Sequence, residues 1–217
     1  MHEDRKNVLA YRVIFTALLL LLALVTLSVT TGGSVPAADL RFDAILYALR
    51  TPALVSVAKA VSLLGETVIV LLITAAVCGI LFSKKLRAKA VGLAITVLGA
   101  GGSAYILKEA FARARPPAPL PAAIETSFSF PSGHAALSMT LYGFGAYLLC
   151  RRYPNLSPII LAAATLLILI VGFSRLYLGV HYPSDVVGGY LVGGLWIIVG
   201  TWTAGSLERK NGGAIVR

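Results

Sequence analysis

The chain has 217 residues, of which 58% are hydrophobic and 13% charged, and its mean hydropathy is +0.85. These values exclude an ordinary soluble domain and indicate a protein whose main solvent is lipid. The net charge of +10 would suit a nucleic-acid partner, but the basic residues lie in short clusters between apolar stretches, which is typical of membrane topology, so no nucleic-acid partner is expected. Cys78 and Cys150 lie inside apolar runs without metal-ligand spacing, so neither a disulfide framework nor a metal is expected.

Six apolar runs are long enough, or nearly so, to cross about 30 Å of hydrocarbon, which takes about 20 helical residues. They are residues 13–29, 66–82, 91–107, 135–149, 157–173 and 186–202. The first run follows basic residues, as a secretory signal does, but its apolar core is longer than a typical signal core, so a retained helix is expected. The sequence therefore predicts an all-α integral membrane bundle of six transmembrane helices. Residues 1–217 would form one domain, with a tail from Asn211 onward.

The distribution of lysine and arginine predicts the orientation of the bundle. With the N-terminus inside, the inner segments hold 12 of the 19 basic residues: Arg5, Lys6, Arg12, Lys84, Lys85, Arg87, Lys89, Arg151, Arg152, Arg209, Lys210 and Arg217. The outer segments hold the others: Arg41, Arg50, Lys59, Lys108, Arg113, Arg115 and Arg175. The positive-inside rule then places both termini in the cytoplasm.

The segment of residues 36–65, between the first two runs, mixes charged and apolar residues and is too polar for a simple span. Its pattern is moderately amphipathic and suits a helical hairpin or an interfacial helix on the outer surface. Such a segment would either cap the bundle or guide a lipid substrate, and the sequence favours neither role.

Three polar stretches follow, all on the predicted outer side, and the first covers residues 108–116 (KEAFARARP). Lys108 and Arg115 are seven residues apart, close to two helical turns of about 3.6 residues, so a continuing helix would present both on one face. A guanidinium matches phosphate oxygens as a planar fork, and an ammonium adds a compact charge. Two such cations alone are more often interface anchors, and Arg113, on another face, is expected to be one.

The second stretch covers residues 130–134 (FPSGH) and precedes an apolar run, as a helix start does. Ser132 would cap this helix, and Gly133 would let a ligand approach the backbone. The free N–H groups and the helix dipole at such an end form an anion site. His134, in the first turn, would reach the bound anion, although a single histidine at a helix end is usually structural.

The third stretch covers residues 174–185 (SRLYLGVHYPSD). Pro183 suits the first turn of a helix, so Asp185 would lie in that turn and reach back to His181. A carboxylate on one imidazole nitrogen fixes the tautomer and frees the other nitrogen to attack. Arg175 would complete a group of cations. Taken alone, Asp185 would equally well satisfy backbone donors at the helix start.

Together the three stretches supply the groups that phosphoryl transfer requires without a metal. Cations and backbone N–H groups would hold the phosphate oxygens, one histidine would attack, and the second would protonate the leaving oxygen. Phosphate is therefore the expected ligand class, and no cofactor is expected.

These stretches fit the patterns K-x6-R-P, P-S-G-H and S-R-x5-H-x3-D, and so resemble the type 2 phosphatidic acid phosphatase superfamily, which also includes vanadium haloperoxidases. All three patterns occur in order with intact spacing over residues 108–185, and the helix layout extends the likeness to most of the chain. The resemblance implies that His181 is the nucleophile that becomes phosphorylated and that Asp185 is its partner. It implies that His134 is the acid for the leaving group and then the base for water. It further implies that phosphate is bound by Lys108, Arg115, Ser132, Gly133 and Arg175.

The resemblance implies a multi-pass plasma-membrane enzyme that dephosphorylates a lipid phosphate or diphosphate on the extracytoplasmic side. Bacterial relatives of similar size hydrolyse undecaprenyl diphosphate, phosphatidylglycerol phosphate or phosphatidic acid, and undecaprenyl diphosphate is the first choice. A lipid phosphotransferase using the same site is the alternative enzyme. A non-catalytic lipid-phosphate binder or transporter would need the cations but not both histidines, and a haloperoxidase would be soluble. The glycine-rich stretches permit close packing within one chain or between two, so the oligomeric state stays open.

Overall fold

The computed structural model describes residues 2–32, 34–117 and 121–213, and within these ranges every regular element is a helix. The α-helices are α1 (His2–Thr30), α2 (Ser34–Ala48), α3 (Pro52–Ser62), α4 (Thr67–Ser83), α5 (Arg87–Phe111), α6 (Gly133–Arg152), α7 (Ser157–Tyr177) and α8 (Pro183–Gly213). Two short 3-10 turns cover Leu63–Gly65 and Pro154–Leu156. The predicted all-α fold is confirmed. Helix α8 continues past Asn211, and residues 214–217 of the predicted tail lie outside the described residues.

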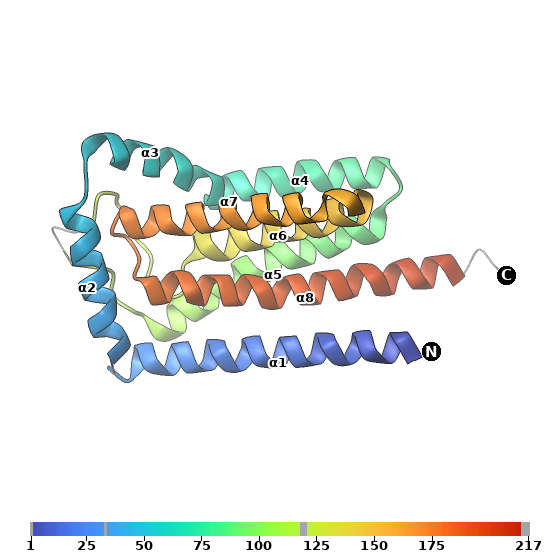
Figure 1. Ribbon diagram of the computed structural model, residues 1–217, viewed down its shortest axis with the longest axis horizontal. Coiled ribbons are helices and arrows are strands. Elements are labelled where there is room, and N and C mark those ends of the chain that lie inside the picture. Colours follow the sequence, from blue (N-terminus) through green and yellow to red (C-terminus); the bar gives the residue numbers. More distant parts are fainter. Residues whose placement is uncertain (1, 33, 118–120, 214–217) are drawn as a thin grey trace.

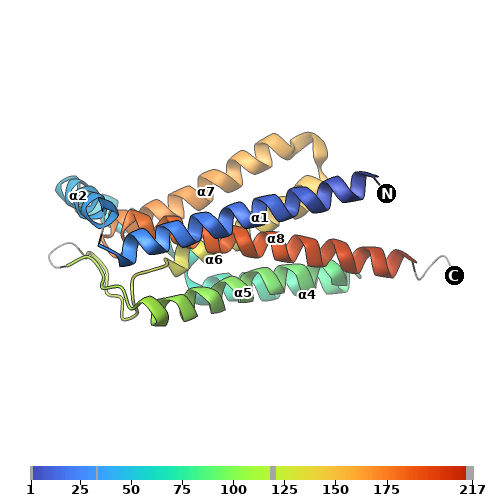
Figure 2. The same cartoon turned by 90° about the horizontal axis from the view of Figure 1, so that it is seen from below.

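The long helices run side by side along the long axis of the molecule, and α2 crosses one end of the bundle (Figure 1). The start of α1 and the end of α8 lie at the opposite end from α2, and α1 runs along α8 in both views (Figures 1 and 2). Because helices α5, α6 and α8 pack on one another, they form the centre of the bundle. This arrangement separates an end that carries the termini from an end that carries α2.

Helices occupy all six predicted spans, but not all of them meet a simple membrane criterion. By length and hydropathy, four segments could cross a membrane: Val8–Thr30, Arg87–Phe111, Pro154–Tyr177 and Pro183–Lys210. A fifth span would be the pair Pro52–Gly65 and Thr67–Ser83, which is bent by 43°. Helix α6 does not meet the criterion, although it lies in the bundle against α5, α7 and α8. The chain is thus built to span a membrane several times, and the count of six stays a prediction.

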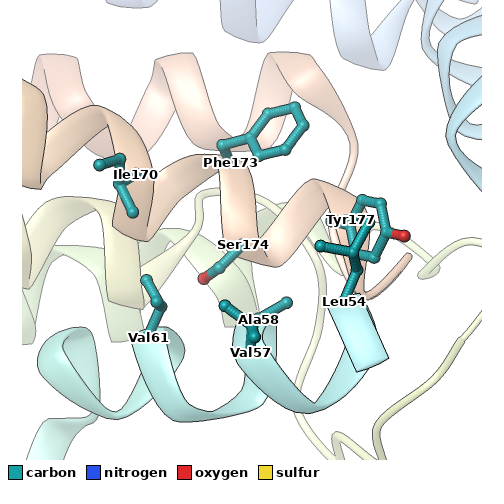
Figure 3. Close-up of a pocket in the computed structure, with 8 residues that line it drawn as sticks. All are labelled: Leu54, Val57, Ala58, Val61, Ile170, Phe173, Ser174 and Tyr177. Carbon is teal, nitrogen blue, oxygen red and sulfur yellow. The ribbon is translucent and has the colours of Figure 1, made fainter. Parts of the chain in front are cut away.

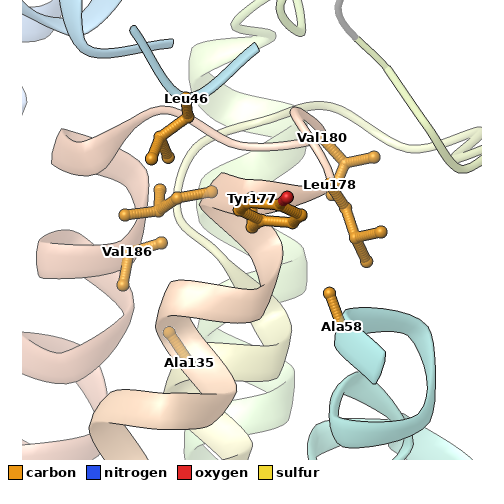
Figure 4. Packing of buried hydrophobic residues seen from close by; sticks show 8 residues of the cluster. Leu46, Ala58, Ala135, Tyr177, Leu178, Val180 and Val186 are labelled. Atoms are coloured by element: carbon orange, nitrogen blue, oxygen red, sulfur yellow. The ribbon is translucent and has the colours of Figure 1, made fainter. Parts of the chain in front are cut away.

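The segment predicted as a hairpin or an interfacial helix forms two helices, α2 and α3. Thr51 starts α3, where its hydroxyl accepts from the Leu54 N–H at 3.3 Å, and Pro52 occupies the first turn. Leu46 of α2 packs in an apolar cluster with the last turn of α7 and the residues that follow it, including Tyr177 and Val180 (Figure 4). This cluster holds α2 against the ends of α7 and α8.

Glycines allow the N-terminal halves of α6 and α8 to approach closely. A Cβ atom at Gly189 would lie 2.4 Å from the backbone oxygen of Ser132 and 2.8 Å from the Cβ of Ala135. A Cβ at Gly193 would meet Met139 at 2.7 Å. Real side chains do not approach backbone atoms this closely, so the two helices lie together only because these positions have no side chain.

We expect Gly189→Ala to lower the stability of the protein by about 1–3 kcal/mol, because the added methyl group overpacks the contact with α6. The matched control is Gly79→Ala on α4, where an added Cβ meets nothing within 4 Å. That control should leave the melting temperature unchanged or raise it, because alanine favours a helix over glycine by about 1 kcal/mol. Thermal unfolding in detergent tests both variants, and an unchanged melting temperature for Gly189→Ala would contradict the close approach.

Candidate active site

The loop between α7 and α8 and the first turn of α8 bring His181 and Asp185 together. Helix α7 ends at Tyr177, and Gly179, with a φ of 65°, turns the chain toward His181. Helix α8 begins at Pro183, as predicted, so Asp185 lies in its first turn. His181 Nδ1 lies 3.4 Å from Asp185 Oδ2, and both side chains are buried. The predicted pairing is therefore present, with His181 Nε2 turned away from the carboxylate.

Asp185 is surrounded by hydrogen-bond donors. The N–H of Tyr182 donates to Oδ2 at 2.9 Å, and the Ser129 hydroxyl donates to the same oxygen. Ser129 also lies 3.5 Å from His181 Nδ1. A carboxylate that accepts several hydrogen bonds is held in one orientation and in its charged form.

The second polar stretch meets the third through the backbone. Ser132 caps α6, with its hydroxyl accepting from the Ala135 N–H at 3.5 Å, which confirms the predicted helix start. The N–H of Ser132 donates to the backbone oxygen of Asp185 at 2.9 Å. Gly133, the first residue of α6, lines a cavity, and Lys108 lines the same cavity. The start of α6 therefore lies directly beside the start of α8.

His134, in the first turn of α6, lies in the electrostatic field of the other site residues. The positive charges of Arg175, Arg115 and Lys108 all act on its ring. Its Nε2 is 3.2 Å from Oε2 of Glu66, the residue that precedes α4. The two histidines thus share one end of the bundle, and Glu66 adds a carboxylate that the sequence patterns did not indicate.

Arg115 lies against the free nitrogen of His181. Its Nη1 donates to the backbone oxygen of Val180 at 2.6 Å and lies 3.3 Å from His181 Nε2. The predicted continuing helix is wrong, because α5 ends at Phe111 and Ala112 takes a left-handed φ of 44°. Arg115 reaches the site from the loop, where its Nε also donates to the backbone oxygen of Ser127 at 2.7 Å.

Lys108 and Arg175 approach from the last turns of α5 and α7. Lys108 is buried and donates to the backbone oxygens of Phe128 and Ser129, the latter at 3.3 Å. Arg175, also buried, donates to the Ser62 hydroxyl at 2.5 Å and forms an ion pair with Glu125.

Glu125, in the loop between α5 and α6, bridges two of these cations. One carboxylate oxygen pairs with Arg175, and the other lies 3.7 Å from Arg115 Nη2. An anion therefore already sits between the two guanidinium groups that were predicted to hold phosphate. The chemistry of this position suits a phosphate that displaces the carboxylate.

Arg113, predicted as an interface anchor, instead belongs to the site. Its Nη1 lies 2.5 Å from Asp185 Oδ1, and its Nη2 lies 2.8 Å from Asp39 Oδ2 on α2. The prediction assumed that α5 continues past Phe111, and the turn at Ala112 redirects Arg113 into the protein. Nothing in the local pattern indicated Asp39, which is 74 residues away from Arg113.

Two cavities have mainly apolar linings, and the first of them adjoins the site. One, of about 360 Å³, lies between α4, α5 and α6 and reaches Lys108 and Ser127. The other, of about 170 Å³, lies between α3 and α7, where Val57, Phe173 and Ser174 are among the residues that line it (Figure 3). In the part of the chain that the structure describes, no group of three His, Cys, Asp or Glu side chains is placed to bind a metal.

Known proteins resemble this chain in both sequence and fold. The chain is 44% identical to a phosphatidylglycerophosphatase B of Bacillus subtilis over 92 residues, which are 41% of this chain and 44% of that protein. It is 40% identical to an undecaprenyl-diphosphatase of Sulfolobus acidocaldarius over 72 residues, 33% of this chain and 31% of the relative. These matches thus span less than half the length of each curated relative.

The structural likeness is broader. The crystal structure of a transmembrane PAP2-type phosphatidylglycerolphosphate phosphatase from Bacillus subtilis superposes with a TM-score of 0.80 and 28% sequence identity. This superposition covers 90% of this chain and 96% of that one. Residues 89–208, more than half of the chain and all three polar stretches, match the PAP2 superfamily. The chain is therefore a member of the PAP2 superfamily.

Proposed function

We propose that this protein is a membrane phosphatase that hydrolyses a lipid phosphate or diphosphate through a phosphohistidine on His181. The observation that carries the proposal is the placement of His181 between an orienting carboxylate and a guanidinium. Asp185 lies on the Nδ1 side, and Arg115 lies 3.3 Å from Nε2. A phosphate bound to Arg115 would therefore present its phosphorus atom to the nitrogen that is free to attack.

The reaction then proceeds in two steps. In the first, His181 Nε2 forms a bond to phosphorus while the bond to the leaving oxygen breaks, and His134 gives that oxygen a proton. In the second, His134 takes a proton from water, the resulting hydroxide attacks phosphorus, and the N–P bond breaks to release inorganic phosphate. Arg115, Arg175 and Lys108, together with the N–H groups at Ser132 and Gly133, would stabilise the charge on the phosphoryl oxygens.

Several observations support a lipid as the substrate. The site lies at one end of a bundle with large apolar side chains on its outer surface, including Leu98 and Tyr105 beside the cavity that reaches Lys108. The names of the relatives include both a phosphatidylglycerophosphatase and an undecaprenyl-diphosphatase. Because the structural likeness to the phosphatidylglycerolphosphate phosphatase extends over most of the chain, we propose phosphatidylglycerol phosphate first and undecaprenyl diphosphate second.

The distribution of basic residues supports a plasma-membrane enzyme whose site faces outward. The loop between α7 and α8, which contains His181, lies at the end of the bundle that carries α2, and the start of α1 and the end of α8 lie at the other end (Figure 1). Most lysines and arginines outside the site belong to the terminal end, so the positive-inside rule favours an extracytoplasmic site. Labelling of single cysteines introduced at Arg41 and Lys84 in intact cells would test this orientation.

A panel of lipid phosphates tests the proposed activity. Purified protein in detergent would be given phosphatidylglycerol phosphate, undecaprenyl diphosphate and phosphatidic acid, and free phosphate would be measured. Release of phosphate from at least one lipid is the expected result. No release from any of them would overturn the proposal, and transfer to a lipid hydroxyl without free phosphate would identify a phosphotransferase.

The pH dependence of the reaction should follow His181. Burial, together with the positive charges of Arg115 and Lys108, lowers the pKa of His181 to about 4, and the hydrogen bond that its ring donates to Asp185 offsets only part of this effect. Only the neutral ring attacks, so kcat/KM should hold as the pH falls from neutral and be lost as it passes below about 4. A pH–rate profile, corrected for titration of the substrate phosphate, measures this. An acidic limb near the ordinary histidine pKa of about 6.5 would contradict it.

A further inference from the structure

Helix α2, which belongs to none of the three polar stretches, contacts the start of α8 through one buried carboxylate. Asp39 Oδ1 accepts from the backbone N–H of Ser184 at 3.1 Å, and Oδ2 accepts from the Ser184 hydroxyl. These contacts satisfy a donor at the N-terminus of α8 from a different helix. The first turn of α8, which carries Asp185, is thereby attached to α2.

Arg113 links the same carboxylate to Asp185. One arm of its guanidinium lies 2.8 Å from Asp39, and the other lies 2.5 Å from Asp185 Oδ1 and 2.8 Å from the Ser184 hydroxyl. The guanidinium also lies over the ring of Tyr182, 4.2 Å from its centroid. A planar group held by this many contacts is fixed in one orientation. It therefore also fixes the orientation of the Asp185 carboxylate that it binds.

The two oxygens of Asp185 have separate roles in this arrangement. Oδ1 faces Arg113, whereas Oδ2 faces His181 Nδ1, the Tyr182 N–H and the Ser129 hydroxyl. As long as Arg113 holds Oδ1, the carboxylate cannot rotate Oδ2 away from His181. We infer that Arg113 and Asp39 are positioning residues, which keep Asp185 aligned with His181 and make α2 part of the catalytic machinery; this inference rests on the proposed function.

Burial gives these contacts their importance. The side chains of Asp185, Asp39 and Arg113 are 0%, 4% and 12% exposed. Removing one member of a buried ion pair leaves its partner uncompensated, and that partner then moves or takes other contacts. Loss of Asp39 would free one arm of the Arg113 guanidinium and leave Arg113 with Asp185, Ser184 and the ring of Tyr182.

Asp43, one turn further along α2, is also buried, and neither of its oxygens has a hydrogen-bond partner among the described residues. Burial first, and then the negative charge of Asp39, raise the pKa of Asp43 to about 7. Asp43 therefore carries a proton in the acidic range and adds little negative charge there. Asp39, rather than Asp43, is the carboxylate of α2 that holds Arg113.

The test compares Asp39→Asn and Arg113→Lys with the wild type. Asparagine keeps the shape of the side chain without its charge, and lysine keeps the charge but not the fork that holds two carboxylates. We expect kcat to fall by about 10- to 100-fold in each variant, as is typical when the partner of an active-site ligand is removed. KM should change by less than about threefold, because neither residue touches the phosphate. The matched control is Glu109→Gln, an exposed carboxylate on α5.

A second measurement separates positioning from a loss of folded protein. In Asp39→Asn, Arg113 holds Asp185 less firmly, so the bond between His181 and Asp185, which favours the protonated ring, should weaken. The acidic limb of kcat/KM should therefore move to lower pH. Fewer folded molecules would lower kcat without moving that limb. The kcat of the double variant should be no lower than that of the less active single variant, because both changes break the same chain of contacts.

Each outcome has a separate meaning. If the wild type releases no phosphate from any lipid, or if His181→Ala remains active, the proposed function fails, whatever Asp39 does. If the wild type is active and depends on His181, but Asp39→Asn and Arg113→Lys match Glu109→Gln in both kcat and pH profile, the positioning role is overturned. A fall in kcat with an unmoved acidic limb also overturns it, because α2 would then contribute stability alone.

Discussion

Replacing His181 with alanine should abolish turnover and leave no phosphorylated protein. The side chain is 2% exposed, so the substitution removes the proposed attacking nitrogen without altering the outer surface. Removing a nucleophile typically lowers kcat by about 10⁴-fold or more. The measurement is release of phosphate together with alkaline quenching of enzyme that has been given a lipid radiolabelled in its phosphate, since a phosphohistidine is stable to base and lost in acid.

The matched control is His2→Ala. His2 is the first residue of α1, and the start of α1 lies at the end of the bundle opposite α2 (Figure 1). This variant should retain wild-type turnover and wild-type labelling. His134→Ala should still accept phosphate, slowly, because the attacking ring is intact, and its label should persist because water is no longer activated. Wild-type activity in folded His181→Ala would reject the proposed nucleophile.

The sequence predicted those features of the site that depend on neighbouring residues. Ser132 caps α6 and Pro183 begins α8, because capping and the fixed φ of proline act within a single turn. The pairing of His181 with Asp185 followed from the same local geometry. Apolar runs placed the six long helices, since lipid-facing surfaces require continuous hydrophobic stretches.

The features that the sequence did not predict depend on contacts between distant segments. The left-handed turn at Ala112 ends α5 early, although nothing in ARARP separates a helix end there from one three residues later. That turn moved Arg115 onto a loop and turned Arg113 inward. Asp39 reaches its partner Ser184 across 145 residues, and Glu125 reaches Arg175 across 50. Charged residues on a mixed segment suggest solvent exposure, and only the packing of α2 onto the bundle buries Asp39.

Asp185→Asn should lower kcat by about 10²- to 10⁴-fold, with little change in KM. The reason is that every group around the carboxylate is a donor: Arg113 at Oδ1, and the Tyr182 N–H and the Ser129 hydroxyl at Oδ2. The asparagine amide would place its NH2 group against either the donor at Oδ1 or the donors at Oδ2, so the side chain must rotate or withdraw. His181 then loses the contact that fixes its tautomer.

The measurement is the rate at which the phosphohistidine forms in a single turnover, because orientation of His181 matters in that step. Glu109→Gln again provides the isosteric control at an exposed position. Ser129→Ala, which removes one donor to the same oxygen, should lower the rate by a smaller factor than Asp185→Asn. If Asp185→Asn forms the phosphorylated intermediate at the wild-type rate, the carboxylate serves only to hold the start of α8, and His181 is oriented by Arg115 and Ser129 alone.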